Sequence, residues 1–86
     1  MSEDEILSAQ IRAGRALLGW SQVDLAERTG LSKTVIASLE QGNTDARMST
    51  LALIRKAFDE AGVTFITDRD GSYGVRRRGR GEPQNP

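Results

Sequence analysis

The sequence predicts a mainly α-helical fold, a bundle of four to five helices followed by a C-terminal β-strand or hairpin. Apolar residues recur at intervals of three and four through most of the chain before Gly62, which is the spacing of amphipathic helices. Glycines interrupt this pattern where helices would end. After Gly62 apolar and polar residues alternate, as they do in a strand. The 86 residues are expected to form one domain with a modest core.

The first helix is expected from Glu5 to Leu18, because Leu7 and Ile11 lie at helical spacing within it. Gly19 can end this helix, since glycine adopts the left-handed cap conformation without a steric cost. Residues 1–6 are expected to form a flexible N-terminus.

The second helix carries its own start signal. Ser21 is a typical N-cap residue, and Asp24, three residues later, completes the acidic form of a capping box. The helix is therefore expected to begin at Gln22 and to stop at Gly30.

A third helix is expected to begin at Lys33, after the N-cap residue Ser32, and to end near Gly42. At about 100° per residue, its residues divide between two sides. The side expected to face the core carries Val35, Ile36 and Leu39. The opposite side carries Lys33, Thr34, Ala37 and Ser38.

The last elements follow a polar, turn-rich loop at residues 42–46. Leu51, Ile54 and Phe58 at helical spacing predict a fourth helix that closes at Gly62. Alternation over residues 63–67 and 73–76, on both sides of a turn, predicts a β-hairpin. We assign the aromatic residues Trp20, Phe58 and Phe65 to the core.

Composition excludes several classes of function. The chain has no cysteine and no histidine, so thiolate metal sites and histidine-based catalysis are excluded. We interpret Asp24 and Glu27 as surface charge and expect neither an enzyme nor a cofactor. No apolar run is long enough to span a bilayer, and the acidic start lacks the basic region of a signal peptide. These features predict a cytoplasmic protein without a membrane partner.

The outward side of the third helix indicates a nucleic-acid partner. Lysine and arginine balance aspartate and glutamate at 12 each, so distribution of charge matters more than its sum. Short side chains on this helix would let its backbone approach base edges closely. A threonine methyl group or an alanine can meet a thymine methyl group, hydroxyls can pair with several bases, and Lys33 can reach guanine acceptors. Ser21 and Gln22, at a helix N-terminus, are suited to holding a phosphate.

The residues between Ile11 and Ile66 resemble the Cro and lambda-repressor-like helix-turn-helix regulators of bacteria and phages, the xenobiotic-response-element (XRE) family. The resemblance rests on the residues 15–22, on Leu25-Ala26 with Gly30-Leu31-Ser32, and on Ile36 with Leu39-Glu40-Gln41-Gly42.

The resemblance implies a lambda-repressor-like bundle in residues 7–62, with a recognition helix at Ser32 to Gln41. It also implies a homodimer that represses transcription from a palindromic operator of double-stranded DNA. The residues that match the family's ion pair are Arg15 and Glu40, to which we give a structural role. The base-reading residues would be Lys33, Thr34, Ala37 and Ser38. The phosphate-binding residues would be Ser21, Gln22, Ser32, Gln41 and Asn43.

The segment after the bundle leaves alternatives open. The hairpin of residues 63–78 is expected either to build the dimer or to cap its own bundle, and the dimer residues would be Val63, Phe65, Ile66 and Val75. Residues 79–86 are expected to form a disordered tail. The arginine run is either a solvated tail or a phosphate-contacting arm, and comprises Arg76, Arg77, Arg78 and Arg80. A second hypothesis for the whole chain is an antitoxin or anti-activator that acts mainly by binding another protein.

Overall fold

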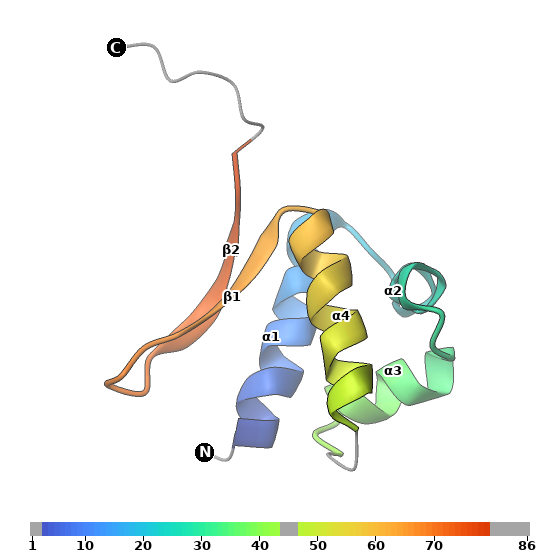
Figure 1. Cartoon of the computed structure of the whole chain (residues 1–86), viewed down its shortest axis with the longest axis horizontal. Helices are drawn as coiled ribbons and strands as arrows, with labels where there is room; N and C mark the ends of the chain where they lie inside the picture. Colours follow the sequence, from blue (N-terminus) through green and yellow to red (C-terminus); the bar gives the residue numbers. More distant parts are fainter. Residues whose placement is uncertain (1–2, 44–46, 80–86) are drawn as a thin grey trace.

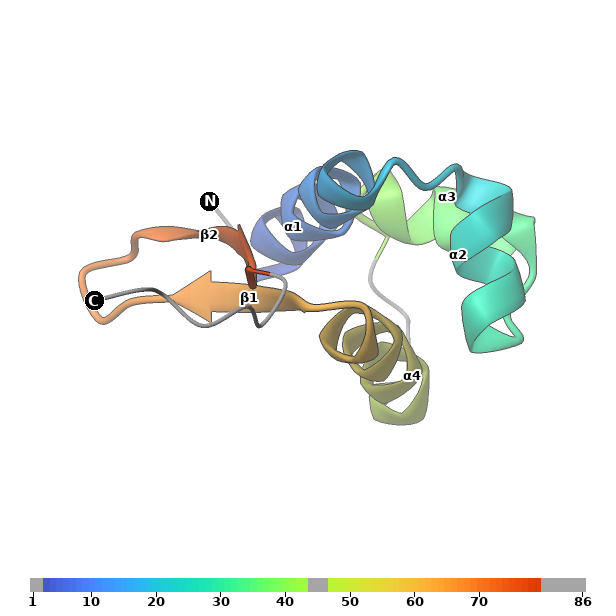
Figure 2. The ribbon, with the colours of Figure 1, turned by 90° about the horizontal axis from the view of Figure 1, so that it is seen from above.

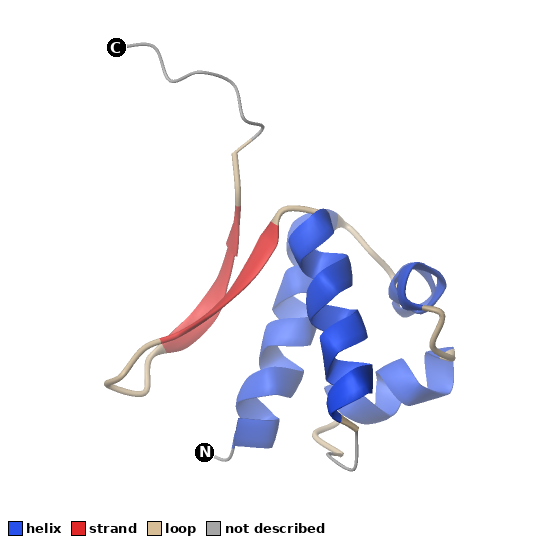
Figure 3. Cartoon of the chain, viewed as in Figure 1, coloured by secondary structure: helices blue, strands red, loops and turns tan. Residues whose placement is uncertain are grey.

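The computed structural model describes residues 3–43 and 47–79, and Figures 1 and 3 show their elements. Four helices precede a two-stranded antiparallel hairpin, which confirms the predicted fold class. The elements are α1 (Glu3–Leu18), α2 (Gln22–Thr29), α3 (Lys33–Glu40), α4 (Met48–Glu60), β1 (Val63–Thr67) and β2 (Tyr73–Arg77). None of the helices in these two ranges is long and apolar enough to cross a membrane.

The helices α1 and α4 form the middle of the molecule. The short helices α2 and α3 lie at one end and the hairpin lies at the other, as Figures 1 and 2 show in two views. The hairpin is therefore remote from α3, and the two regions can serve different purposes.

The ends of the short helices follow the predicted cap chemistry. The Ser21 hydroxyl accepts a hydrogen bond from the backbone N–H of Asp24, and the Asp24 carboxylate accepts one from the backbone N–H of Ser21. The helix α2 ends at Gly30, whose φ of 77° is the left-handed conformation that glycine adopts readily. The Ser32 hydroxyl accepts from the N–H of Val35 and so caps α3.

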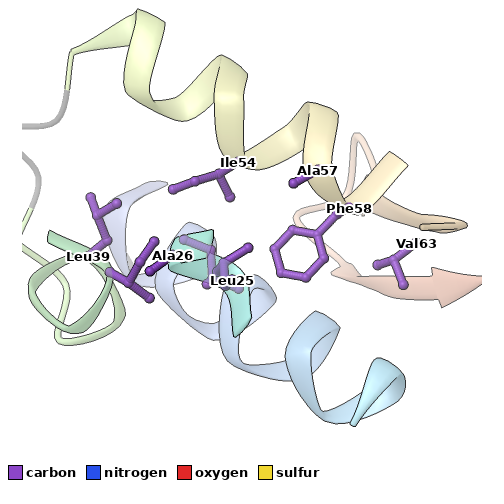
Figure 4. Close-up of a cluster of buried hydrophobic side chains, with 9 residues drawn as sticks. Leu25, Ala26, Leu39, Ile54, Ala57, Phe58 and Val63 are labelled. Carbon is purple, nitrogen blue, oxygen red and sulfur yellow. The ribbon is translucent and has the colours of Figure 1, made fainter. Parts of the chain in front are cut away.

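Phe58 lies at the centre of the core. Its ring stacks on Trp20 at 5.7 Å between centroids and packs against Phe65 at 5.3 Å, which confirms the core assignment of all three aromatic residues. Gly14 of α1 lets this ring approach, because a methyl group at that position would lie 2.9 Å from Phe58 Cε1. Figure 4 shows labelled side chains of the cluster pointing into the space between the helices. The buried apolar residues are Ile11, Leu25, Ala26, Ile36, Leu39, Ile54, Ala57, Phe58 and Val63.

Gln10 joins the hairpin to α1. Its Nε2 atom donates to the backbone oxygens of Ile66 and Gly74, both at 3.0 Å, and these two residues face each other in the register of the hairpin. Gln10 is only 3% exposed. Its buried amide is satisfied by these two carbonyl oxygens, as a buried polar group requires.

Some expectations need correction. Helix α1 begins at Glu3 rather than Glu5, so it extends into the segment 1–6 that was expected to be flexible. Val35 is 37% exposed rather than buried with Ile36, because the bundle contacts a narrower stripe of α3 than the helical wheel assigned. Predictions for residues 1–2, 44–46 and 80–86, including Arg80 and most of the tail, fall outside the described residues.

Candidate nucleic-acid interface

The outward side of α3 forms a shallow hollow that is open to solvent. Lys33 and Thr34 are exposed, and Ala37 and Ser38 are half-buried. All four residues line the hollow together with Gln41, which follows the last turn of the helix. The structure thus brings the four predicted base-reading residues together on one surface and leaves them uncovered by the described chain.

The opposite side of α3 holds the helix in place. Ile36 is completely buried and Leu39 nearly so, and both belong to the core cluster. Glu40 is also buried, at 4% exposure. Because these three residues recur at helical spacing, the residues between them must face solvent.

An ion pair fixes α3 to α1. Arg15 Nε donates to Glu40 Oε2 at 2.6 Å and Arg15 Nη2 donates to Glu40 Oε1 at 2.8 Å, the two-point geometry that arginine forms with a carboxylate. The hydrogen bond to Glu40 raises the pKa of Arg15 above its already high ordinary value, so the Arg15 guanidinium stays protonated. The same arginine donates to the backbone oxygen of Trp20, just before α2.

Arg12 adds a second link between the same two helices. Its Nη1 atom donates to the backbone oxygen of Glu40 at 2.8 Å, at the C-terminal end of α3. Arg12 thus has a partner inside the chain.

Gln22, at the start of α2, is tied to the same carboxylate. Its Nε2 atom donates to Glu40 Oε1 at 3.2 Å, and its side chain is half-buried. Glu40 therefore connects α1, α2 and α3, and it fixes the position of Gln22 relative to the hollow.

The two cap residues Ser21 and Ser32 are exposed at the N-termini of α2 and α3. Their hydroxyl oxygens accept from backbone N–H groups, as described above. The backbone hydrogen bond from Ser21 is the main cause that lowers the pKa of Asp24, so this carboxylate stays ionised as part of the cap.

Ser38 and Asn43 form a pair that the sequence did not reveal. The Nδ2 atom of Asn43 donates to Ser38 Oγ at 3.1 Å, and the backbone N–H of Asn43 donates to the Ser38 carbonyl oxygen at 3.1 Å. One residue predicted to bind phosphate thus contacts one predicted to read a base. The backbone bond follows Gly42 in the left-handed conformation and is part of the Schellman C-cap that a glycine after a helix predicts, whereas the side-chain bond belongs to no cap pattern.

The residues predicted for dimerisation are not equally accessible. Val63 is 1% exposed in the single chain, so its side chain belongs to the core and offers no surface to a second copy. Phe65, Ile66 and Val75 are half-buried.

Two arginines of the C-terminal run bond to helix ends. Arg77 donates to the backbone oxygen of Leu17 at 3.0 Å, and Arg78 donates to that of Asp59 at 3.1 Å. These contacts give both arginines a structural role next to the ends of α1 and α4. Arg76 is exposed.

Comparison with known proteins identifies the family to which this chain belongs. A helix-turn-helix family model matches residues 11–63. The control protein C.SmaI of Serratia marcescens is 34% identical over 67 residues, which are 78% of this chain and 80% of that protein. The HTH-type transcriptional regulator YazB of Bacillus subtilis is 34% identical over 62 residues, which are 72% of this chain and 86% of that protein.

Solved structures agree with this assignment. The crystal structure of the hypothetical transcription factor NHTF from Neisseria matches with a TM-score of 0.64 and 26% identity, over 67% of each chain. The clp gene regulator ClgR from Corynebacterium glutamicum matches with a TM-score of 0.60 and 30% identity, over 65% of this chain and 60% of that one. The chain belongs to the XRE-type helix-turn-helix family of DNA-binding transcription regulators.

Proposed function

We propose that this regulator represses transcription by binding a palindromic operator as a homodimer, with α3 of each copy in the major groove. The observation that carries the proposal is the uncovered hollow on α3, lined by Lys33, Thr34, Ala37, Ser38 and Gln41. A recognition helix must present side chains to base edges while its other side is fixed in the protein. The burial of Ile36, Leu39 and Glu40 supports this arrangement.

The side chains of the hollow suit direct contact with bases. Lys33 can donate to the O6 and N7 acceptors of guanine, and the methyl groups of Thr34 and Ala37 suit a thymine methyl group. Their small volume lets the helix backbone come close to the duplex. The operator sequence would follow from the combination of these contacts.

The residues around the hollow suit phosphate contacts, which set the docking position without selecting a sequence. Ser21 and Ser32 lie at helix N-termini, where free backbone N–H groups favour an anion. Since both hydroxyls accept from the backbone, their hydrogens remain available to a phosphate. The carboxamides of Gln22, Gln41 and Asn43 complete the proposed set.

The hairpin is the proposed dimer element. Each of its two strands has one edge without a backbone partner in the described part of the chain, and pairing of such an edge with a second copy would satisfy these groups. Phe65, Ile66 and Val75 would contribute side-chain contacts. Because the hairpin lies at the end opposite α3, a dimer built there leaves both hollows free (Figure 1). Binding to successive major grooves would require the two recognition helices of the dimer to lie about 34 Å apart.

The experiment is selection of bound sequences from a random pool of double-stranded DNA with the purified protein. We expect a two-fold symmetric motif. Lys33→Ala and Thr34→Ala should each relax preference at particular positions, whereas Gln22→Ala should weaken binding to all sequences alike. Lys56→Ala is the matched control for Lys33→Ala, since Lys56 is the other lysine of the chain and is exposed on α4. It should leave the motif unchanged.

Two outcomes would contradict the proposal. If Lys33→Ala and Thr34→Ala leave both affinity and preference untouched, α3 is not the reading helix. If the protein protects no defined DNA segment but retains a protein partner after Lys33→Glu, the hypothesis of an antitoxin or anti-activator would replace it. An asymmetric motif, together with a monomeric mass in solution at working concentration, would remove the dimer and keep the DNA contact.

A further inference from the structure

We infer that Asn43 biases the Ser38 hydroxyl toward donating a hydrogen bond to DNA, so that Ser38 selects against cytosine at the base it faces. The inference rests on the proposed function, because it assumes that α3 enters the major groove. It assigns Asn43 a role beyond phosphate contact, as a residue that positions a base-reading side chain.

The position of Asn43 is fixed by the backbone as well as by its side chain. Gly42 has a φ of 91°, and its N–H donates to the Leu39 carbonyl oxygen at 3.1 Å. The next N–H, that of Asn43, donates to the Ser38 carbonyl oxygen. The chain therefore turns back over the last turn of α3 and brings the Asn43 carboxamide to 3.1 Å from Ser38 Oγ.

The hydrogen bonds of the Ser38 hydroxyl can be counted. A hydroxyl has one hydrogen to donate and two lone pairs to accept with. The Asn43 amide occupies one lone pair. Within residues 3–43 and 47–79, the structure gives the Ser38 hydrogen no acceptor. Since Ser38 lines the hollow, this hydrogen is available to a base. Accepting a hydrogen bond also polarises the hydroxyl and makes it a better donor.

A donor at this point distinguishes cytosine from the other bases. In the major groove guanine presents O6 and N7 as acceptors, adenine presents N7, and thymine presents O4. Cytosine presents only the hydrogens of its N4 amine. A free serine would accept from that amine as readily as it donates elsewhere, and would select weakly. The Asn43 contact takes one of the two lone pairs, leaves the hydrogen free and polarises the hydroxyl, so it shifts the balance toward donation.

The test compares the motifs selected from a random DNA pool by the wild-type protein, Ser38→Ala, Asn43→Ala and Asn43→Asp. Ser38→Ala identifies the position that depends on Ser38. There the wild-type protein should disfavour cytosine about fivefold, the effect of one neutral hydrogen bond. Asn43→Ala should remove most of this discrimination at that position alone. Any loss of a phosphate contact would lower affinity for all sequences alike and is thus separable from it.

Asn43→Asp gives the sharpest outcome. A carboxylate only accepts hydrogen bonds, so it would take the Ser38 hydrogen and leave the hydroxyl oxygen facing the DNA as an acceptor. Preference at the Ser38 position should then turn toward cytosine, while total affinity falls because a negative charge lies near phosphates. Lys56→Ala is the control, since Lys56 is exposed on α4 and does not line the hollow. It should leave the preference at that position unchanged.

The outcomes separate the two proposals. If the wild-type protein selects no motif at all, the proposed function fails and this inference fails with it. If it selects a motif but favours cytosine at the Ser38 position, the inference alone is overturned. The same holds if Ser38→Ala changes no position, or if folded Asn43→Ala keeps the wild-type discrimination.

Discussion

The helix-turn-helix and the hairpin are both fixed to α1, but by opposite chemistry. The helix-turn-helix is held by the charged pair of Arg15 with the buried Glu40, supported by Arg12. At its buried contact the hairpin is held by a neutral amide, that of Gln10, which donates to two carbonyl oxygens, and the charged link from Arg77 to Leu17 is exposed. A buried charged pair therefore anchors the proposed DNA-contacting helix, whereas the buried contact of the hairpin is a neutral hydrogen bond.

The difference has an energetic consequence. A buried carboxylate without its charged partner carries the full cost of its lost solvation, whereas a carbonyl group that keeps its strand partner and loses a second donor carries a smaller cost. The anchor of the helix-turn-helix is therefore expected to be the more sensitive of the two to a single substitution.

The largest effect is expected from Arg15→Met. This change leaves Glu40 charged and buried without its partner, and should lower the free energy of unfolding by about 3–5 kcal/mol, measured by urea denaturation. The double variant Arg15→Met with Glu40→Leu should recover most of the loss, because it removes the unpaired charge as well. A loss below about 1 kcal/mol for the single variant would show that the pair contributes no more than a surface contact.

Gln10→Leu should have the next largest effect. It removes the donor to the carbonyl oxygens of Ile66 and Gly74, and the expected loss is about 1–2 kcal/mol, since two hydrogen bonds are lost while both carbonyl groups keep their partners across the hairpin. Hydrogen exchange of the hairpin amides should accelerate more than that of α2 and α3. Arg77→Ala provides the comparison, because its bond to Leu17 is exposed and should matter much less. Equal acceleration in all elements would show that Gln10 stabilises the whole bundle.

Gly14→Ala tests the contact between α1 and the Phe58 ring, which lies between the two anchored regions. The added methyl group would lie 2.9 Å from Phe58 Cε1, and crowding of this kind costs about 1–3 kcal/mol. Alanine also favours a helix by about 1 kcal/mol over glycine. We expect a net loss of about 1 kcal/mol in thermal or urea unfolding. Gly74→Ala is the control, because nothing lies within 4 Å of its added methyl group, and it should lose less.

Local chemistry was predictable from the sequence and long-range chemistry was not. The caps at Ser21 and Ser32 could be predicted because each bonds to a residue three positions away. Gln10 could not, because its two partners lie 56 and 64 residues further along the chain, and an amide between apolar positions looks the same whether it faces solvent or a carbonyl group.

The candidate site was predictable to a similar degree. The four residues of the outward side of α3 follow from helical spacing. Helical spacing did not predict the exposure of Val35, because the width of the buried stripe depends on how the neighbouring helices pack. The pairing of Arg15 with Glu40 came from the resemblance to a family and not from the residues alone, since nothing in their spacing of 25 positions indicates contact.

The smallest expected effect is on the pH dependence of stability. The helix-turn-helix and the hairpin each carry one carboxylate whose pKa is lowered in the folded protein. Hydrogen bonds from Ser21, chiefly from its backbone N–H, lower the pKa of Asp24 in the helix-turn-helix, and hydrogen bonds involving Ser72 lower the pKa of Asp70 in the hairpin turn. A carboxylate whose pKa is lower in the folded than in the unfolded state stabilises the fold above its unfolded pKa, about 4, and this contribution disappears as the pH falls through the folded pKa. Asp24→Asn and Asp70→Asn should thus each lower the melting temperature slightly at neutral pH. The difference from wild type should shrink below about pH 4. If it stays constant down to about pH 2, the loss arises from the shape of the amide and not from charge, and neither turn depends on an ionised cap.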